Sequence, residues 1–246
     1  MSLQPLPRFA ALQKPCRRYV NGERLACQAM LVHDRRVRIE TERQRVDALD
    51  DKLNATARAL RGAYAGGAIA PLRGVLEPTD ADGAYAVQAL NTRYWLDAGR
   101  RIVGRKVGLT AKAVQAQLGV DQPDFGVLFE DMALADGGVL DPGRILHPKA
   151  EGEVAMILGA DLAGPEISRA DVAAAVAEVA ASIEIVDSRI ADWKITFADT
   201  VADNGSSAAF VLGPDRHPLA GADLWRSGEH TSELPSRFGI SYAVFC

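Results

Sequence analysis

The sequence predicts an α+β fold in which a mixed β-sheet is surrounded by peripheral helices. Segments with helical periodicity and segments with the apolar composition of strands follow one another between residues 54 and 213. They do not alternate regularly enough to predict a doubly wound parallel sheet. The chain has 246 residues, of which 48% are hydrophobic and 24% are charged, so it is long enough to bury a sizeable core.

Helix signals define the first elements along the chain. The spacing in residues 54–67 predicts a helix that stops at two consecutive glycines. In residues 79–99, Thr79 is the predicted N-cap, Asp82 stands at the capping-box position, and Gly99 marks the end. Two shorter helices are predicted over residues 111–119, capped by Thr110, and over residues 167–181, capped by Ser168.

Apolar segments bounded by turn residues predict the strands. They are residues 101–109, the end of the turn-rich segment 120–129, and residues 150–158, 182–188 and 208–213. A turn that contains Trp193 and a polar loop over residues 198–207 are predicted between the last two strands.

Charge and cysteine content restrict the kinds of partner. The net charge of −4 does not favour binding to nucleic acid or to an anionic membrane, so small molecules or metal ions are the expected partners. The three cysteines have neither disulfide-framework nor zinc-ligand spacing, which is typical of a reducing compartment. Without an apolar run of about 20 residues or a secretory signal, the sequence predicts a cytoplasmic protein.

The two ends of the chain differ from the segment between them. Residues 1–50 contain ten Lys or Arg against six Asp or Glu, and predict a surface helix, a flexible arm or a start codon assigned too far upstream. From about Trp225 the sequence RSGEHTSELPSRFGISYAVFC has neither helical nor strand periodicity.

An unusual pair of acids, Glu151 and Glu153, lies in the apolar strand AEGEVAMIL. Side chains alternate between the faces of a strand, so both carboxylates are expected on the same face. A third acid, Glu184, lies in the middle of the strand SIEIVDS. Three such carboxylates can converge on a divalent cation such as Mg²⁺ or Mn²⁺, although an E-x-E pair also occurs on solvent-facing strands.

Other polar residues are weaker candidates. Lys106, between glycines in RIVGRKVGL, can bind a carboxylate or transfer a proton, or can be a surface lysine of an edge strand. Asp121 and Asp124 in GVDQPDFG are candidates for an active-site loop or for turn formation. Asp203, Asn204, Ser206 and Ser207 are candidates for substrate contacts or for loop and capping bonds. His147 has no second His at ligand spacing and is interpreted as structural.

Five blocks in this order carry a family resemblance: GRKVGLT, GVDQPDFGVLFEDM, AEGEVAMIL, IEIVDSRIADW and TVADNGSSAAFVLG. Together they resemble the 2-keto-4-pentenoate hydratases of aromatic meta-cleavage pathways, within the fumarylacetoacetate-hydrolase-like superfamily. The resemblance implies a mixed-β fold with peripheral helices and a homo-oligomer. It also implies hydration of 2-hydroxypenta-2,4-dienoate to 4-hydroxy-2-oxopentanoate, which is the reaction of a hydro-lyase.

The same resemblance implies the site residues. Glu151, Glu153 and Glu184 would hold Mg²⁺ or Mn²⁺, Lys106 and Asp124 would complete the active site, and Ser206 would contact the substrate. The alternatives are a 2-oxo-3-hexenedioate (4-oxalocrotonate) decarboxylase on the same scaffold, and an inactive fragment or partner subunit. Association with a pathway decarboxylase is a further expectation.

Comparison with the family pattern also predicts the domain organisation. Residues 1–53 are an Arg-rich extension without a counterpart, and residues 54–224 are a hydratase-like catalytic domain. Family members continue with further strands and a helix, so this domain is expected to be incomplete at its C-terminus. Residues 225–246 are expected to be an aberrant tail that resembles translated sequencing-adapter DNA.

Overall fold

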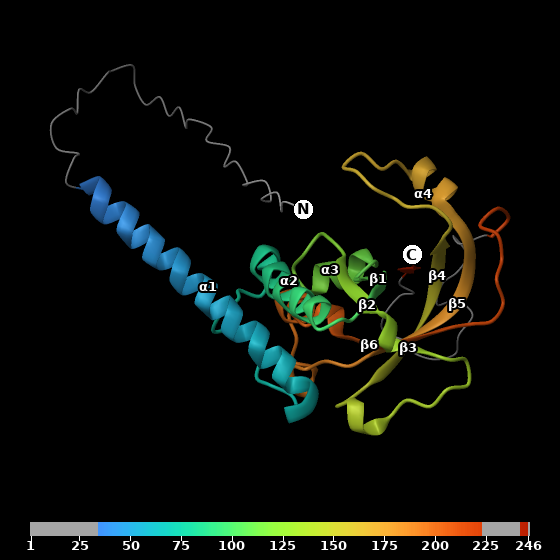
Figure 1. The fold of residues 1–246 in the computed structure, drawn as a ribbon, viewed down its shortest axis with the longest axis horizontal. Coiled ribbons are helices and arrows are strands. Elements are labelled where there is room, and N and C mark those ends of the chain that lie inside the picture. Colours follow the sequence, from blue (N-terminus) through green and yellow to red (C-terminus); the bar gives the residue numbers. More distant parts are fainter. Residues whose placement is uncertain (1–33, 223–241, 246) are drawn as a thin grey trace, which may run out of the picture. The chain divides into compact units, whose positions relative to one another are not determined.

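The computed structural model describes residues 34–222 and 242–245 (Figure 1). Two units are distinguished, Met1–Arg45 and Val46–Cys246, and the elements below belong to the second unit except for the start of helix α1. Of the predicted extension 1–53, residues 1–33 lie outside the described part, and residues 34–53 are helical. The boundaries at residues 53 and 224 stay predictions.

One mixed sheet organises the described part of the second unit. Its strand order is β2-β1-β7-β4-β5-β6-β3. The pairs β4–β7 and β3–β6 are parallel and the other neighbours are antiparallel, so the predicted mixed sheet is confirmed. The strands are β1 (Ile102–Gly108), β2 (Asp124–Phe129), β3 (Ala133–Leu134), β4 (Lys149–Leu158), β5 (Val176–Val186), β6 (Ser207–Leu212) and β7 (Tyr242–Phe245).

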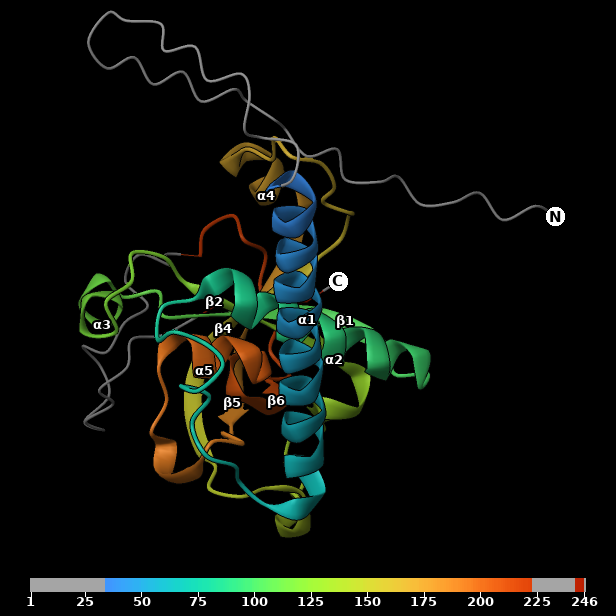
Figure 2. The same cartoon turned by 90° about the vertical axis from the view of Figure 1, so that its left-hand side faces the viewer.

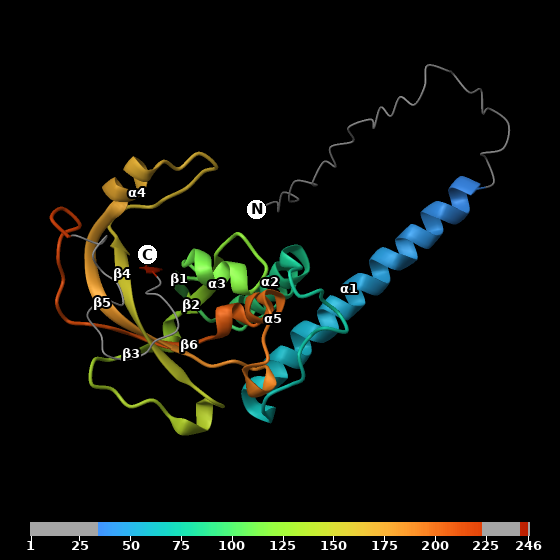
Figure 3. The same ribbon diagram turned by 180° about the vertical axis from the view of Figure 1, so that it is seen from behind.

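Helices surround this sheet, as the α+β prediction requires. The α-helices are α1 (Asp34–Gly66), α2 (Ala81–Asp97), α3 (Lys112–Gln117), α4 (Arg169–Ala175) and α5 (Phe197–Ala202). Short 3-10 turns are η1 (Glu130–Met132), η2 (Pro142–Arg144), η3 (Ala191–Trp193) and η4 (Asn204–Ser206). Figures 2 and 3 show α2 and α5 side by side, next to the C-terminal half of α1.

Two apolar clusters hold these layers together. The first joins the C-terminal half of α1 to α2 and α5, through residues such as Leu60, Val87, Phe197 and Val201. The second lies on the sheet around Phe129 and contains residues of β2, β4 and β6. The first cluster positions α5 and therefore the turn that follows it, which contributes to the site described below.

Strand β7 is the only described part of the predicted tail 225–246. Its residues pair with β1 on one side and with β4 on the other; Ala243 lies opposite both Lys106 and Ala155. The tail has no strand periodicity, so the sequence did not predict this strand. It connects the strand that carries Lys106 to the strand that carries Glu151 and Glu153.

Several predicted helix limits are confirmed and two caps are wrong. Helix α1 ends at Gly66, α2 ends before Gly99, and Ser168 caps α4 through a reciprocal bond with Asp171. The N-cap of α2 is Asp80, whose carboxylate accepts the N–H of Gly83, rather than Thr79. The N-cap of α3 is Ala111 rather than Thr110.

Two longer predictions are also wrong. The helix predicted over residues 167–181 ends at Ala175, and β5 begins at Val176. Alanines in this segment suit a helix, but pairing of residues 176–181 with the second half of β4 favours the extended chain. The loop predicted over residues 198–207 contains most of helix α5, which Thr196 caps together with Asp199.

Candidate active site

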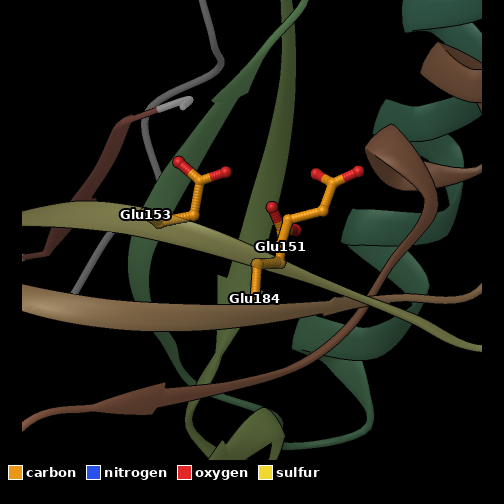
Figure 4. Close-up of side chains that lie close together, drawn as sticks. All are labelled: Glu151, Glu153 and Glu184. Atoms are coloured by element: carbon orange, nitrogen blue, oxygen red, sulfur yellow. The ribbon is translucent and has the colours of Figure 1, made fainter. Parts of the chain in front are cut away.

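Three carboxylates converge on one face of the sheet. Glu151 and Glu153 lie two residues apart in β4, and Glu184 in β5 lies directly opposite Glu151. Figure 4 shows all three side chains on the same side of the two strands. One carboxylate oxygen from each residue lies within 4.8 Å of the others. The predicted convergence is therefore present, and the acids are not a solvent-facing E-x-E pair.

Burial makes this acidic cluster energetically demanding. Glu153 and Glu184 are only 6% and 5% exposed, and Glu151 is half-buried. Burial raises the pKa of Glu184 above its ordinary value, although the positive charge of Lys106 and a hydrogen bond from Ser207 oppose this effect. Buried carboxylates at this spacing require positive charge to offset their repulsion and desolvation.

Lys106 supplies part of that positive charge. It is 5% exposed in β1, and its Nζ lies 3.5 Å from Oε2 of Glu184. The ammonium also donates a hydrogen bond of 2.9 Å to the carbonyl of Gly205. Burial opposes its charge, but the surrounding carboxylates, Glu184 foremost, raise the pKa of Lys106 above its usual value. The interpretation as a surface lysine of an edge strand is wrong.

Asp124 completes the charged group from the neighbouring strand. It is the first residue of β2, is 3% exposed, and lies opposite Gly108. A Cβ on Gly108 would overlap Oδ1 of Asp124 and lie 3.2 Å from Nζ of Lys106, so both charged groups converge over this glycine. Within the described residues, Oδ1 of Asp124 is buried and accepts no hydrogen bond. Asp121 is exposed and is not part of the group.

A left-handed turn closes the site from the side of α5. Ser206 lies in this turn with φ of 54°, is 3% exposed, and has its hydroxyl 3.3 Å from that of Thr200. Ser207 follows and donates a hydrogen bond of 2.9 Å to Oε1 of Glu184. Asp203 and Asn204, the other candidates of this segment, bind Arg189 and Val127. The turn therefore organises the acidic cluster as well as bordering it.

A cavity of about 320 Å³ brings most of these residues together. Lys106, Asp124, Glu151 and Ser206 line it, and the ion pair with Lys106 places Glu184 at its border. Much of the remaining wall is apolar, with Leu109, Val114, Leu118, Trp193 and Ile195. A small molecule with one charged end and one hydrocarbon end matches this division of the wall.

Sequence reasoning missed other residues around this cavity. Lys149 also lines it, with its Nζ 3.8 Å from the centre of the Trp193 ring. The indole of Trp193 donates to the carbonyl of His147, and His147 packs edge-on against the same ring, which agrees with a structural His147. Arg189 was also missed; it does not line the cavity, but it is 1% exposed and binds Asp203 next to the turn. The sequence signal that could have indicated a buried Arg189 was its place directly after the predicted buried strand SIEIVDS.

Relatives with known names cover most of this part of the chain, although no family model matches it. Over 176 residues the chain is 51% identical to the 2-keto-4-pentenoate hydratase of Burkholderia vietnamiensis (strain G4 / LMG 22486). The aligned residues make up 71% of this chain and 67% of the relative. The chain belongs to the 2-keto-4-pentenoate hydratase family. It is also 57% identical over 171 residues to 2-keto-4-pentenoate hydratase 1 of Dechloromonas aromatica (strain RCB).

A third relative and one solved structure extend this family assignment. The chain is 38% identical over 208 residues to the 2-hydroxyhexa-2,4-dienoate hydratase of Comamonas testosteroni. These residues are 83% of this chain and 76% of the relative. The 4-oxalocrotonate decarboxylase from Pseudomonas putida G7, complexed with magnesium and adipate, has a TM-score of 0.66 and 34% identity, covering 71% of this chain and 67% of that one.

Coverage of the relatives is partial. The hydratase-family chain matches 65% of the length of the Dechloromonas relative. The activity, substrate and partners of the whole protein are therefore proposals. Among the described residues, no helix is both long and apolar enough to cross a membrane.

Proposed function

We propose that this hydratase-family protein adds water to 2-hydroxypenta-2,4-dienoate and forms 4-hydroxy-2-oxopentanoate, in the catabolism of aromatic compounds by meta-cleavage. The observation that carries the proposal is the convergence of three glutamates, together with Lys106 and Asp124, beside a cavity that Lys106, Asp124 and Glu151 line. The names of the relatives as hydratases support this reaction class.

Glu151, Glu153 and Glu184 are the proposed ligands of a divalent cation. One carboxylate oxygen of each lies within 4.8 Å of the others, which is close enough for all three to contribute to one divalent cation after small side-chain adjustments. The solved relative is complexed with magnesium in one structure and calcium in another, and we propose Mg²⁺ or Mn²⁺ here. When bound, such a cation would draw electrons from the carboxylate and 2-oxo group of the substrate.

Lys106 is proposed to act as a cation at the substrate. Its raised pKa keeps the ammonium charged at neutral pH, which suits a carboxylate anchor or a proton donor better than a general base. The Gly205 carbonyl fixes the ammonium on one side, and Glu184 does so on the other. Among the described residues these two contacts use two of the three N–H groups, and the third can donate to a substrate oxygen.

Asp124 and Ser206 are proposed to handle protons, water and substrate oxygens. Ketonisation removes the proton of the 2-hydroxyl group and adds one at C5. The water oxygen then adds to C4 and a proton to C3, so one water is consumed in all. Asp124, with a buried oxygen that accepts no hydrogen bond among the described residues, can carry a proton or orient this water. The Ser206 hydroxyl borders the same cavity.

The apolar wall favours the hydratase over the decarboxylase. A 2-oxo-3-hexenedioate carries a second carboxylate at the end where the dienoate has only a hydrocarbon group. Besides Lys106, Lys149 is the cation of the described cavity wall, and it already lies over Trp193. Assays with both substrates and Mg²⁺ or Mn²⁺ separate the two, and release of CO₂ without hydration would favour the decarboxylase.

Neutralising one glutamate tests the proposed metal centre. We expect Glu153→Gln to lower Mn²⁺ affinity in calorimetry by at least about tenfold and to abolish metal-dependent consumption of the dienoate, because the amide supplies no charge. Glu178→Gln is the control, since Glu178 lies in the same strand as Glu184 but six residues earlier, opposite Ile157, and is exposed. Unchanged Mn²⁺ affinity in Glu153→Gln would remove Glu153 from the ligand set.

Assembly and completeness stay predictions. A homo-oligomer and association with a pathway decarboxylase are both proposed from family likeness, and size-exclusion chromatography with light scattering measures them. A chain that binds Mn²⁺ without turning over either substrate would favour the inactive fragment or partner subunit.

A further inference from the structure

We infer that Arg189 and Asn204 are positioning residues, which hold the turn Asn204–Ser206 in the shape that anchors Lys106 and aims Glu184. Neither side chain lies among the residues that line the proposed catalytic cavity. Both act on it through the turn. The inference rests on the proposed function for its kinetic and Mn²⁺ readouts, but not for its chemical-modification readout.

The backbone of the turn is conformationally unfavourable, so other contacts must stabilise it. Asn204, Gly205 and Ser206 have φ of 59°, 62° and 54°, all in the left-handed region. Each non-glycine residue in that region costs about 1 kcal/mol or more. A Cβ on Gly205 would lie 3.0 Å from Cδ of Lys106, so glycine also allows the lysine to approach.

Arg189 binds the chain on both sides of this turn. Its Nε donates to Oδ1 of Asp203 at 2.6 Å, and its Nη2 donates to the Asp203 carbonyl at 2.8 Å. Nη1 donates to the carbonyl of Ser207 at 3.2 Å, and the backbone N–H of Arg189 donates to Oδ2 of Asp203 at 2.9 Å. Because Asp203 and Ser207 flank the turn, one guanidinium fixes the separation of its two ends.

Asn204 attaches the turn to the sheet. Its Oδ1 accepts the N–H of Val127 at 2.7 Å, and its Nδ2 donates to the carbonyl of the same residue at 2.9 Å. The side-chain amide thus bonds to β2 as a neighbouring strand would. Gly126 lies beside this contact, and a Cβ there would be 2.6 Å from the Asn204 carbonyl oxygen.

The groups that the turn presents are those that touch the charged cluster. The Gly205 carbonyl accepts a hydrogen bond from Lys106, and the Ser207 hydroxyl donates one to Glu184. A shift of the turn by a fraction of an ångström changes both contacts together. Residues that orient a metal ligand or catalytic group in this way commonly affect affinity or activity by about 10–100-fold.

Arg189→Lys is the first test, with Arg100→Lys as the matched control. Lysine keeps the charge at Arg189 but replaces three directed nitrogens with one. Arg100 binds Asp131 and covers the rings of Trp95 and Phe129, and within the described part of the chain it neither hydrogen-bonds nor ion-pairs with the turn. We expect Arg189→Lys to lower Mn²⁺ affinity and kcat by about 10-fold or more, with a smaller change in KM, and Arg100→Lys to change each less than about twofold.

Circular dichroism identifies the temperature range in which each variant is folded, and the measurements are made there. Reductive methylation followed by mass spectrometry adds a readout that requires neither metal nor substrate. Lys106 is expected to be protected in the wild type and to react faster in Arg189→Lys. A lower melting temperature with wild-type Mn²⁺ affinity, kcat and Lys106 protection would overturn the positioning role of Arg189.

Asn204→Gly is the second test and remains informative if Arg189→Lys does not fold. Glycine relieves the left-handed backbone but removes both bonds to Val127. We expect Mn²⁺ affinity and kcat to fall by about tenfold even though strain is reduced. Wild-type values for this variant would overturn the role of Asn204. A wild-type protein without hydratase activity would remove the proposed function and leave the methylation test intact.

Discussion

The β4–β5 strand pair and the turn Asn204–Ser206, together with Ser207 that follows it, build the same site in opposite ways. In the strand pair, regular alternation and cross-strand pairing place Glu151, Glu153 and Glu184 on one face. In the turn, three consecutive left-handed residues place a carbonyl and a hydroxyl against Lys106 and Glu184. Regular sheet geometry gathers the charges, whereas irregular backbone supplies the uncharged groups that orient them.

The two regions also carry different energetic costs. Carboxylates two residues apart in a strand repel by roughly 2–3 kcal/mol at an effective dielectric constant of about 20. That cost is offset by positive charge from Lys106 and from the proposed cation. The turn carries conformational strain instead, which hydrogen bonds from Arg189 and Asn204 offset. Substitutions that change charge should therefore have their largest effect at the β4–β5 strand pair, and substitutions that change side-chain shape should have theirs at the turn.

Removal of Lys106 should produce the largest effect, because this residue contacts both regions. We expect Lys106→Ala to reduce turnover by about 10³-fold, since a positioned proton donor or charged anchor contributes on that scale. Arg105→Ala is the control, because Arg105 directly precedes Lys106 in β1 and its exposed side chain points to the other face. Steady-state kinetics of both variants measure the difference. Wild-type turnover in Lys106→Ala would exclude the lysine from the reaction.

A pair of glycine substitutions compares the two regions directly by shape. Gly126 faces the turn, where a Cβ would press on the Asn204 carbonyl and on Lys106. Gly152 lies between the two glutamates of β4, and a Cβ there would meet nothing within 4 Å. We expect Gly126→Ala to lower the free energy of unfolding by about 1–3 kcal/mol. Gly152→Ala should be neutral or slightly stabilising. Urea unfolding measures both, and equal effects would mean that the turn is not tightly packed.

Loss of the Ser207 hydroxyl should have a smaller effect on the metal centre. Ser207→Ala removes the hydrogen bond to Glu184 while the charge of the carboxylate remains. We expect Mn²⁺ affinity to fall by up to about tenfold, as for other residues that orient a ligand. Calorimetry with Ser168→Ala as the control measures this, because Ser168 is exposed and its hydroxyl bonds to Asp171 in the cap of α4. No difference between the two variants would show that Glu184 does not need the hydroxyl.

The pH dependence of stability should show the smallest effect. Burial raises the pKa of Asp203 from 3.8 to about 6, against the opposing effect of Arg189. The folded chain therefore binds a proton in a range where the unfolded chain does not, so this contribution to stability is present at low pH and is lost as pH rises through about 6.

Comparison of the wild type with Asp203→Asn isolates this contribution. Relative to the variant, the wild type should gain about 1 kcal/mol of unfolding free energy between pH 7 and pH 5. Urea unfolding at the two pH values measures the change. The opposite sign would mean that the ion pair with Arg189 outweighs burial and holds the pKa of Asp203 below its ordinary value.

Local patterns in the sequence determined the elements of the charged strands. The period of two in AEGEVAMIL placed Glu151 and Glu153 on one face, and the apolar neighbours of Glu184 placed it in a buried strand. The glycine stops of the first two helices and the Ser168 cap were predictable for the same reason. Each depends on residues close together in the chain, where steric and hydrogen-bonding preferences act directly.

Tertiary structure alone decided how those elements meet. The register that sets Glu184 opposite Glu151, the conversion of residues 176–181 from predicted helix to strand, and the place of β7 between β1 and β4 all depend on partners far along the chain. The left-handed turn is stable because Arg189 and the backbone of Val127 bind it. Such contacts have no local signature, since their free energy arises only when distant segments are packed together.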